Sequence, residues 1–236
     1  MIKPIHLIMG LGLSLMLISC NIAQVSDKQI VRKYFRHAAV VYDAQGRVTR
    51  IKCPKETSNL IDTYLFPPKP CRINGPLPSE IGYLTELRIL ILNSAAITEI
   101  PPEIGQLTNL VNLNLSSNEI IILPPEIGQL SNLQRLDLAR NRLTTLPPEI
   151  GALTNLEVLD LSENDLTSLP PEIGQLTDLS GLYLAHNNLT DLPSEIRQLT
   201  NLAGLNLWRN NLSSLPREIW QLREGGTIIS TELTPP

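Results

Sequence analysis

The chain has 236 residues and a net charge of −4, from 19 Lys and Arg against 23 Asp and Glu. This length allows one or two domains, and a hydrophobic share of 42% is enough for a core. The negative charge argues against a nucleic-acid-binding protein that relies on a basic surface. Because only 4% of the residues are aromatic, the core must be aliphatic.

Residues 1–19 have the composition of a secretory signal peptide. Lys3 precedes an apolar run from Leu7 to Ile18, and small Ser19 follows it. As a helix the run would rise about 18 Å, which is too short for a bilayer core of about 30 Å. We therefore predict a segment that is removed on maturation.

The residues Leu17-Ile18-Ser19-Cys20 resemble the lipobox of bacterial lipoproteins. The resemblance implies that Cys20 becomes the first mature residue and is diacylated through its sulfur, an anchor of two or more acyl chains. In such proteins an Asp directly after the cysteine commonly retains the protein at the inner membrane. Asn21 stands there in this chain, which favours the outer membrane. The expectation is an exported protein, lipid-anchored at the cell membrane or outer membrane. The alternative is an ordinary signal peptide with an incidental cysteine.

Cys53 and Cys71 are the other two cysteines, an even number in an oxidising compartment. A disulfide between them would close a loop of about 19 residues and stabilise the fold by roughly 3 kcal/mol. The alternative is two free thiols. A metal site is less favoured, because two ligands with no His or further Cys nearby are too few.

From Leu84 to Gln221 the chain repeats with a period of 23 residues in six copies. The fourth reads LTNLEVLDLSENDLTSLPPEIGQ, and all seven of its aliphatic positions hold Leu or Ile in every copy. This L-x-x-L-x-L-x-x-N-x-L pattern resembles the leucine-rich repeat family over residues 84–221. The LP-x-EIG extension is similar to bacterial members and, at greater distance, to plant and animal Ras-scaffold members.

The pattern predicts an α/β solenoid, a leucine-rich repeat arc with a parallel concave sheet and short 3-10 or α segments or turns on the convex side. The alternation Leu159-Asp160-Leu161 predicts a short strand in each copy. An asparagine recurs where the chain leaves the strand, and we expect its amide to hydrogen-bond the turns of two copies. These ladder positions are Asn118, Asn141, Asn164, Asn187 and Asn210, with Ala95 in the first copy.

Leu-Pro-Pro-Glu-Ile-Gly is expected to form a compact turn and helix on the outer side. Its glutamate recurs at residues 80, 103, 126, 149, 172, 195 and 218. Such a file could bind cations. The interpretation we favour is that each carboxylate offsets the partial positive charge at a short helix N-terminus.

Both ends differ from the repeats. We assign residues 20–30 to the lipidated N-terminus and a linker, and residues 31–83 to an N-terminal cap with a hairpin that turns at Asp43–Gly46. The stretch GRVTRI to YLTEL resembles the lead-in of receptor-type leucine-rich repeat ectodomains. Residues 222–236 are expected to form a C-terminal cap and tail. The predicted lid on the last copy consists of Trp220, Leu222, Ile228 and Ile229.

The chain has no nucleophile elbow, no H-E-x-x-H, no phosphate-binding G-x-x-x-x-G-K and no dinucleotide fingerprint. We expect no catalytic, cofactor-binding or metal-binding residues, and therefore no enzyme.

The concave positions differ from copy to copy, which favours recognition of a protein or peptide. Tyr183 and Trp208 beside Gly181 and Gly204 predict a recess with aromatic anchors, unless the C-terminal tail covers Trp208. The expected partner-binding residues are Arg135, Asp137, Arg140, Tyr183, His186, Trp208 and Arg209. The prediction is a lipid-anchored, monomeric, non-enzymatic binding protein without nucleic acid. The alternatives are a structural envelope protein without a specific ligand and an intracellular signalling scaffold.

Overall fold

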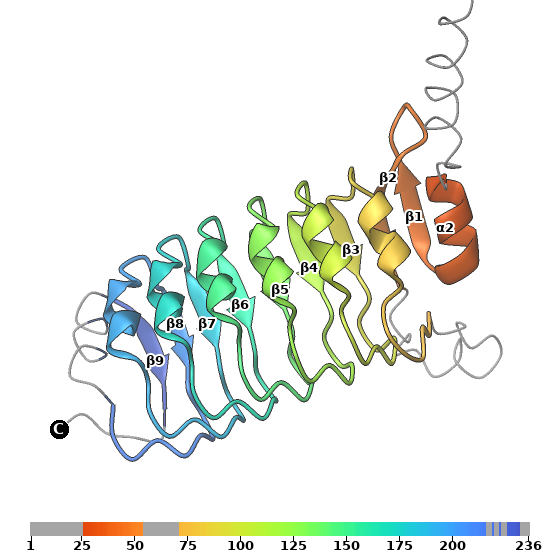
Figure 1. Ribbon diagram of the computed structural model, residues 1–236. Helices are drawn as coiled ribbons and strands as arrows, with labels where there is room; N and C mark the ends of the chain where they lie inside the picture. The colour runs from red at the N-terminus through yellow and green to blue at the C-terminus, as the bar shows by residue number, and fades with distance from the viewer. Residues whose placement is uncertain (1–25, 54–70, 216–218, 220–221, 223–225, 232–236) are drawn as a thin grey trace, which may run out of the picture.

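The computed structural model describes residues 26–53, 71–215, 219, 222 and 226–231. In these residues nine strands form one sheet and lie side by side in chain order. Figure 1 shows the strands along one face of a solenoid and the short helices along the opposite face. The first pair of strands is antiparallel and all later pairs are parallel.

Each repeat contributes one strand of three residues whose central residue is buried. The central Leu159 is fully buried, and it pairs in register with Leu136 on one side and Leu182 on the other. The 23-residue period of the sequence therefore becomes a stack in which equivalent positions form rows. These strands are β3 (Ile89–Ile91), β4 (Asn112–Asn114), β5 (Arg135–Asp137), β6 (Val158–Asp160), β7 (Gly181–Tyr183) and β8 (Gly204–Asn206).

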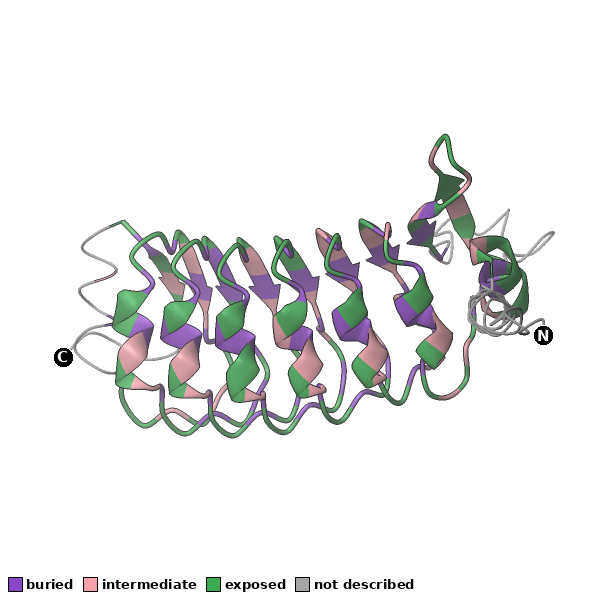
Figure 2. Ribbon diagram, turned by 45° about the horizontal axis from the view of Figure 1, so that its top comes forward, coloured by how far each residue is buried: buried purple, intermediate pink, exposed green. Residues whose placement is uncertain are grey.

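The outer side of the solenoid consists of short 3-10 helices. Pro147, in extended conformation at φ −70°, precedes Pro148 at the start of one of them, where no backbone N–H donor is needed. Ile150 is fully buried, and Figure 2 shows a buried band in the short helices flanked by exposed and intermediate segments. The helices are η1 (Ser79–Tyr83), η2 (Pro102–Gln106), η3 (Pro125–Gln129), η4 (Pro148–Ala152), η5 (Pro171–Gln175) and η6 (Ser194–Gln198).

Glycine in the EIG sequence lets neighbouring helices approach closely. A Cβ atom at Gly151 would lie 2.6 Å from the backbone oxygen of Glu172 in the next repeat. The same glutamates lie in the first turn of each short helix, as expected for a carboxylate near a helix N-terminus. The spacing of the repeats is therefore set by backbone contact on the outer side and by strand pairing on the inner side.

The N-terminal cap consists of α2 (Asp27–Tyr34), β1 (Ala39–Tyr42) and β2 (Val48–Lys52). The two strands form the predicted antiparallel hairpin, in which the N–H of Gly46 donates to the carbonyl of Asp43 at 3.0 Å. The helix starts within the segment assigned to a linker. Its apolar face, with Ile30 buried to 1% exposure, packs into the core, so the cap extends back to Asp27.

An ion-paired cluster joins α2 to the first short helix. Tyr34 Oη and Lys33 Nζ both donate to Glu80 Oε1, the latter at 3.1 Å. The Tyr34 hydroxyl, the backbone N–H of Glu80 itself and the Lys33 ammonium lower the pKa of Glu80 from 4.5 to about 2. The carboxylate form of Glu80 is therefore the form that holds α2 in place.

At the C-terminal end, β9 (Ile228–Ser230) pairs with β8 where the strand of another repeat would lie. Leu222 and Ile229 are partly buried against the core, as a lid requires. Ile228 is 74% exposed, so its predicted place in the lid was wrong. The reason is that successive side chains of a strand point to opposite faces. Trp220, the fourth predicted lid residue, lies outside the described residues.

Candidate binding face

The concave face of the sheet carries the side chains on either side of each buried central residue. On β5, Arg135 is exposed and Asp137 is half-buried on the two sides of Leu136. Strand pairing places Arg135 in one row with Ile89 and Asn112, and Asp137 in the next row. The fold therefore presents a surface whose rows have fixed spacing while their residue types change along the solenoid.

A hollow of about 410 Å³ lies at the N-terminal half of this face, over β1 to β5. We call it the N-terminal hollow. A second hollow of about 420 Å³ adjoins it and shares Arg88, Val111 and Gln134. Among the residues predicted to bind a partner, Arg135 lines the N-terminal hollow. The lining residues are Val41, Thr49, Arg50, Arg88, Ile89, Val111, Asn112, Gln134 and Arg135.

Arg50 and Arg88, which were not predicted from the sequence, line this hollow together with Arg135. Arg50 belongs to the cap hairpin and pairs in register with Ile89, so the first rows of the face begin before the first repeat. Arg88 precedes its strand, one position before the row that contains Arg135. The equivalent residues in the next two copies are Val111 and Gln134, so a comparison of this position across the copies could have identified Arg88.

The side chain of Asp137 is hydrogen-bonded within the concave face. Its carboxylate accepts hydrogen bonds from Asn114 Nδ2 at 2.6 Å and from the backbone N–H of Ala139 at 3.1 Å. Burial and the neighbouring carboxylate of Asp160 raise the pKa of Asp137, against the effect of these donors. Asp160 makes the same turn, with the N–H of Ser162 as donor. Asp137 thus stabilises the turn that follows its own strand.

Three residues after the Asp137 position, each repeat has a residue in left-handed conformation. Arg140, His186 and Arg209 have φ of +58°, +58° and +56°. Arg140 Nε donates to Glu163 Oε1 of the neighbouring repeat at 3.0 Å, an exposed ion pair of small energetic value. The repeated backbone geometry fixes where these side chains leave the chain.

Tyr183 and Trp208 are exposed aromatic residues at the C-terminal half of the face, with exposures of 38% and 45%. A Cβ at Gly181 would lie 3.2 Å from Tyr183 Oη, so the tyrosine ring itself fills the recess predicted at this glycine. The space at Gly204 is open, with no atom within 4 Å of its Cβ position. Trp208 is therefore not covered by β9. Residues 232–236 of the tail lie outside the described residues.

The recurring asparagines connect the repeats. Asn118 Nδ2 donates to the carbonyl of Leu92 at 3.0 Å and to that of Leu115 at 2.8 Å. Its Oδ1 accepts from the N–H groups of Ala95 and Ile97, both at 3.0 Å. The Nδ2 groups of Asn141, Asn164, Asn187 and Asn210 make the equivalent bond to the preceding repeat, one repeat further along each time. The Oδ1 of each accepts from a backbone N–H of that preceding repeat.

A second set of asparagines bonds neighbouring repeats from the exposed side. Asn109, Asn132, Asn155 and Asn201 each donate from Nδ2 to a backbone carbonyl of the preceding repeat, at 2.7 to 3.0 Å. This set was not predicted, although the recurring L-T-N-L or L-S-N-L motif carries the signal. Asp178 stands at this position in the fifth copy, and its carboxylate has no side-chain N–H to donate.

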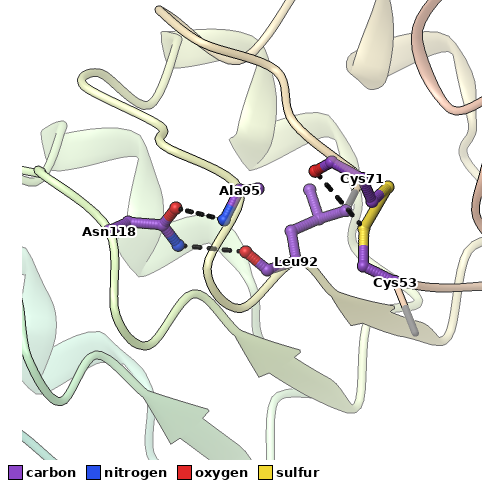
Figure 3. The surroundings of a disulfide bond; sticks show 5 residues. All are labelled: Cys53, Cys71, Leu92, Ala95 and Asn118. Atoms are coloured by element: carbon purple, nitrogen blue, oxygen red, sulfur yellow. Dashed lines mark hydrogen bonds between the residues drawn. A yellow bond between two sulfur atoms is a disulfide. The ribbon is translucent and has the colours of Figure 1, made fainter. Parts of the chain in front are cut away.

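A disulfide joins Cys53, just after β2, to Cys71 ahead of η1, with a Cα–Cα distance of 5.4 Å. Both cysteines are buried, and the N–H of Cys53 donates to the carbonyl of Ile91 at 2.8 Å. Figure 3 shows the disulfide near Leu92, Ala95 and Asn118, at the N-terminal end of the asparagine ladder. The disulfide therefore lies where Ala95 replaces the ladder asparagine.

The predicted signal peptide and the lipidation site Cys20 lie outside the described residues. Among the residues described, no helix has the length and hydrophobicity needed to cross a membrane. The same residues contain no group of three or more His, Cys, Asp or Glu side chains placed to hold a metal ion.

Two family models match the repeats. A leucine-rich repeat model matches residues 131–189, and another leucine-rich repeat model matches residues 109–130. Among curated protein sequences, none matches the chain.

Solved structures with the same architecture include a leucine-rich repeat protein of Leptospira interrogans, at 38% identity and a TM-score of 0.51 over 70% of this chain and 48% of that one. The plant peptide hormone receptor RGFR1 in complex with RGF2 is similar at 30% identity and a TM-score of 0.57, over 66% of this chain and 26% of that one. The PEPR1–AtPEP1 structure is similar at 25% identity and a TM-score of 0.69, over 89% of this chain and 31% of that one.

This chain thus spans less than half the length of each of these proteins. The matched models, the rows of identical positions and the similar structures agree. The chain contains leucine-rich repeats that stack as a solenoid arc, a fold commonly used for protein–protein interaction.

Proposed function

We propose that this chain is a non-enzymatic binding protein that recognises a protein or peptide on its concave face. The observation that carries the proposal is the contrast between the two sides of each strand. The inward side is Leu or Ile in every repeat, whereas the concave side changes and exposes the large aromatic side chains of Tyr183 and Trp208. Exposed aromatics grouped with arginine are typical of interfaces.

The C-terminal half of the face supplies the proposed anchors. Tyr183 and His186 belong to one repeat, and Trp208 and Arg209 occupy the neighbouring one, beside the open space at Gly204. Arg135, Asp137 and Arg140 extend the proposed contact area toward the middle of the arc. The plant receptor complex with RGF2 supports the proposal, since the fold is similar and the receptor is described as a peptide hormone receptor.

We propose further that the protein is exported and anchored by lipid at Cys20, at the cell membrane or outer membrane of a bacterium. The disulfide between Cys53 and Cys71 supports export, because such bonds persist in oxidising compartments. The similarity to the Leptospira protein supports a bacterial origin.

The binding proposal is tested by capture from envelope extracts with the full chain immobilised. Trp208→Ala and Tyr183→Ala should each weaken saturable capture of a protein or peptide by about tenfold or more, as expected for aromatic anchors. Tyr83→Ala is the matched control, because Tyr83 is 61% exposed on η1, away from the concave face. A structural envelope protein without a ligand would give no change with any of the three.

The location is tested separately by mass spectrometry of the mature N-terminus combined with membrane fractionation. We expect a lipid-modified Cys20 and a membrane-bound protein, and Cys20→Ala should release the chain from the membrane. An intracellular scaffold would instead retain residues 1–19, carry an unmodified Cys20 and fractionate with the cytosol.

A further inference from the structure

The N-terminal hollow contains three arginines that lack an acidic partner. Arg50, Arg88 and Arg135 line it, and in the described part of the chain no carboxylate forms an ion pair with them. The acidic residue in the adjoining hollow, Glu86, pairs with Arg47 at 3.1 Å, and Arg47 also pairs with Asp43. Although the chain is acidic overall, this hollow is locally positive.

The surface between the arginines is partly apolar. Ile89 and Asn112 lie between Arg50 and Arg135 in the same row of the sheet, and Val111 and Val41 line the same hollow. The side chain of Val41 is 47% exposed at the edge strand. An occupant therefore meets hydrophobic contact in the middle and positive charge at both ends.

Backbone hydrogen bonds hold the hollow in shape. The carbonyl of Arg88 accepts from the N–H groups of Val111 and Asn112, at 2.8 and 3.1 Å. The carbonyl of Val111 accepts in the same way from Gln134 and Arg135, at 2.9 and 3.1 Å. The arginines thus project from a fixed framework, which lowers the entropy lost on binding.

The spacing of the charges gives the dimension of the occupant. Arg50 and Arg135 are three strand intervals apart, which is about 14 Å at about 4.8 Å per interval. An extended peptide rises about 3.4 Å per residue, so residues four apart in it span about the same distance. Carboxylates make bidentate, charge-assisted hydrogen bonds with guanidinium groups.

We propose that the N-terminal hollow binds an extended segment of a protein or peptide that has acidic residues four positions apart and an apolar residue between them. The segment crosses the strands, with its carboxylates on Arg50 and Arg135 and its apolar side chain against Ile89 and Val111. Arg88 adds positive charge midway. This inference rests on the proposed function and specifies the partner chemistry at the opposite half of the face from Tyr183 and Trp208.

The test uses end-blocked, fluorescein-labelled heptapeptides and the full chain, followed by fluorescence anisotropy. The first probe has Glu at positions 2 and 6, Leu at position 4 and Ser elsewhere. The second has Gln in place of Glu, and the third has the same composition with the two Glu adjacent. We expect the first probe to bind about tenfold more tightly than the others and to weaken with added salt.

Variants assign the binding to the hollow. Arg50→Ala and Arg135→Glu should each weaken the first probe about tenfold, since each removes one charged contact. Arg197→Glu is the matched control, because this exposed arginine lies on η6, on the outer side. Thermal melts monitored by circular dichroism establish that each variant is folded before binding is compared.

Several results would overturn the inference. These are no binding of the first probe up to about 1 mM, equal binding of the three probes, or equal loss with Arg197→Glu. Trp208→Ala should leave probe binding unchanged, so the two proposals can fail independently. Capture that depends on Trp208 with no arginine effect on the probe would remove this inference alone. The reverse result would remove the aromatic anchors alone.

Discussion

The side-chain amide of Asn164 donates a hydrogen bond to the backbone carbonyl of Leu138 in the preceding repeat, at 3.0 Å. It also donates to the carbonyl of Leu161 at 3.0 Å, and its oxygen accepts from the N–H of Leu143 at 3.0 Å. Asn164 is 6% exposed, so water does not readily replace these partners. One side chain therefore satisfies buried backbone groups of two adjacent repeats.

Asn164→Ala should destabilise the solenoid by about 3 kcal/mol or more, because it leaves several buried backbone groups without a partner. The measurement is denaturant unfolding followed by circular dichroism. Asn155→Ala is the control, since Asn155 is exposed and makes one bond, to the carbonyl of Ser131 at 2.7 Å. Its loss should stay under about 1 kcal/mol. Equal losses for the two variants would contradict the role given to the buried ladder.

Gly151→Ala should destabilise the solenoid by about 1–3 kcal/mol, because the added Cβ would meet the backbone of Glu172 at 2.6 Å and its Cβ at 2.8 Å. The backbone cannot rotate out of the way as a side chain can. Gly204→Ala is the matched control, because the position of its Cβ is open. There we expect a neutral or slightly stabilising effect in the same thermal melt. A neutral Gly151→Ala would mean that the outer helices are not in close contact.

Acidification should release α2 from the first short helix. The pKa of Glu80 is lowered from 4.5 to about 2, so its carboxylate stabilises the docked helix at pH values above 4.5. This contribution is lost progressively as the pH falls from 4.5 toward 2. Backbone amide chemical shifts of residues 27–35, followed by NMR over this range, should move together.

Glu80→Gln removes the titrating group and should give loosened α2 signals already at neutral pH. Glu126→Gln is the control, since Glu126 occupies the same place in η3 and the cap is far from it. Unchanged α2 signals in Glu80→Gln would show that hydrophobic packing of the helix is sufficient without the cluster.

Removing the disulfide should loosen the N-terminal end of the solenoid first. The double variant Cys53→Ala, Cys71→Ala should lose about 3 kcal/mol, and hydrogen exchange should accelerate in residues 71–97 before residues 176–207. The reason is that each repeat contacts its neighbours, so a local loss spreads from one end. Reducing agent should have the same effect on the parent chain and none on the double variant. Uniform acceleration along the chain would count against this order.

The repeat alone determined the greater part of the fold. Each period of 23 residues keeps Leu or Ile at seven positions, of which Leu159 is one. These positions can be buried in every copy only if the copies stack side by side. The same period located the strands, the short helices and the asparagines whose amides lie between repeats. These features depend on local patterns that recur, and recurrence made them readable.

Only the tertiary structure decided how the ends and the concave face are built. It placed Arg50 of the cap hairpin in one row with Arg135, which are 85 residues apart in the sequence. It also turned the ring of Tyr183 over Gly181 and directed Ile228 to solvent. Periodicity cannot give these relationships, because they depend on how non-repeating segments pair with the first and last strands and on which rotamers the resulting space allows.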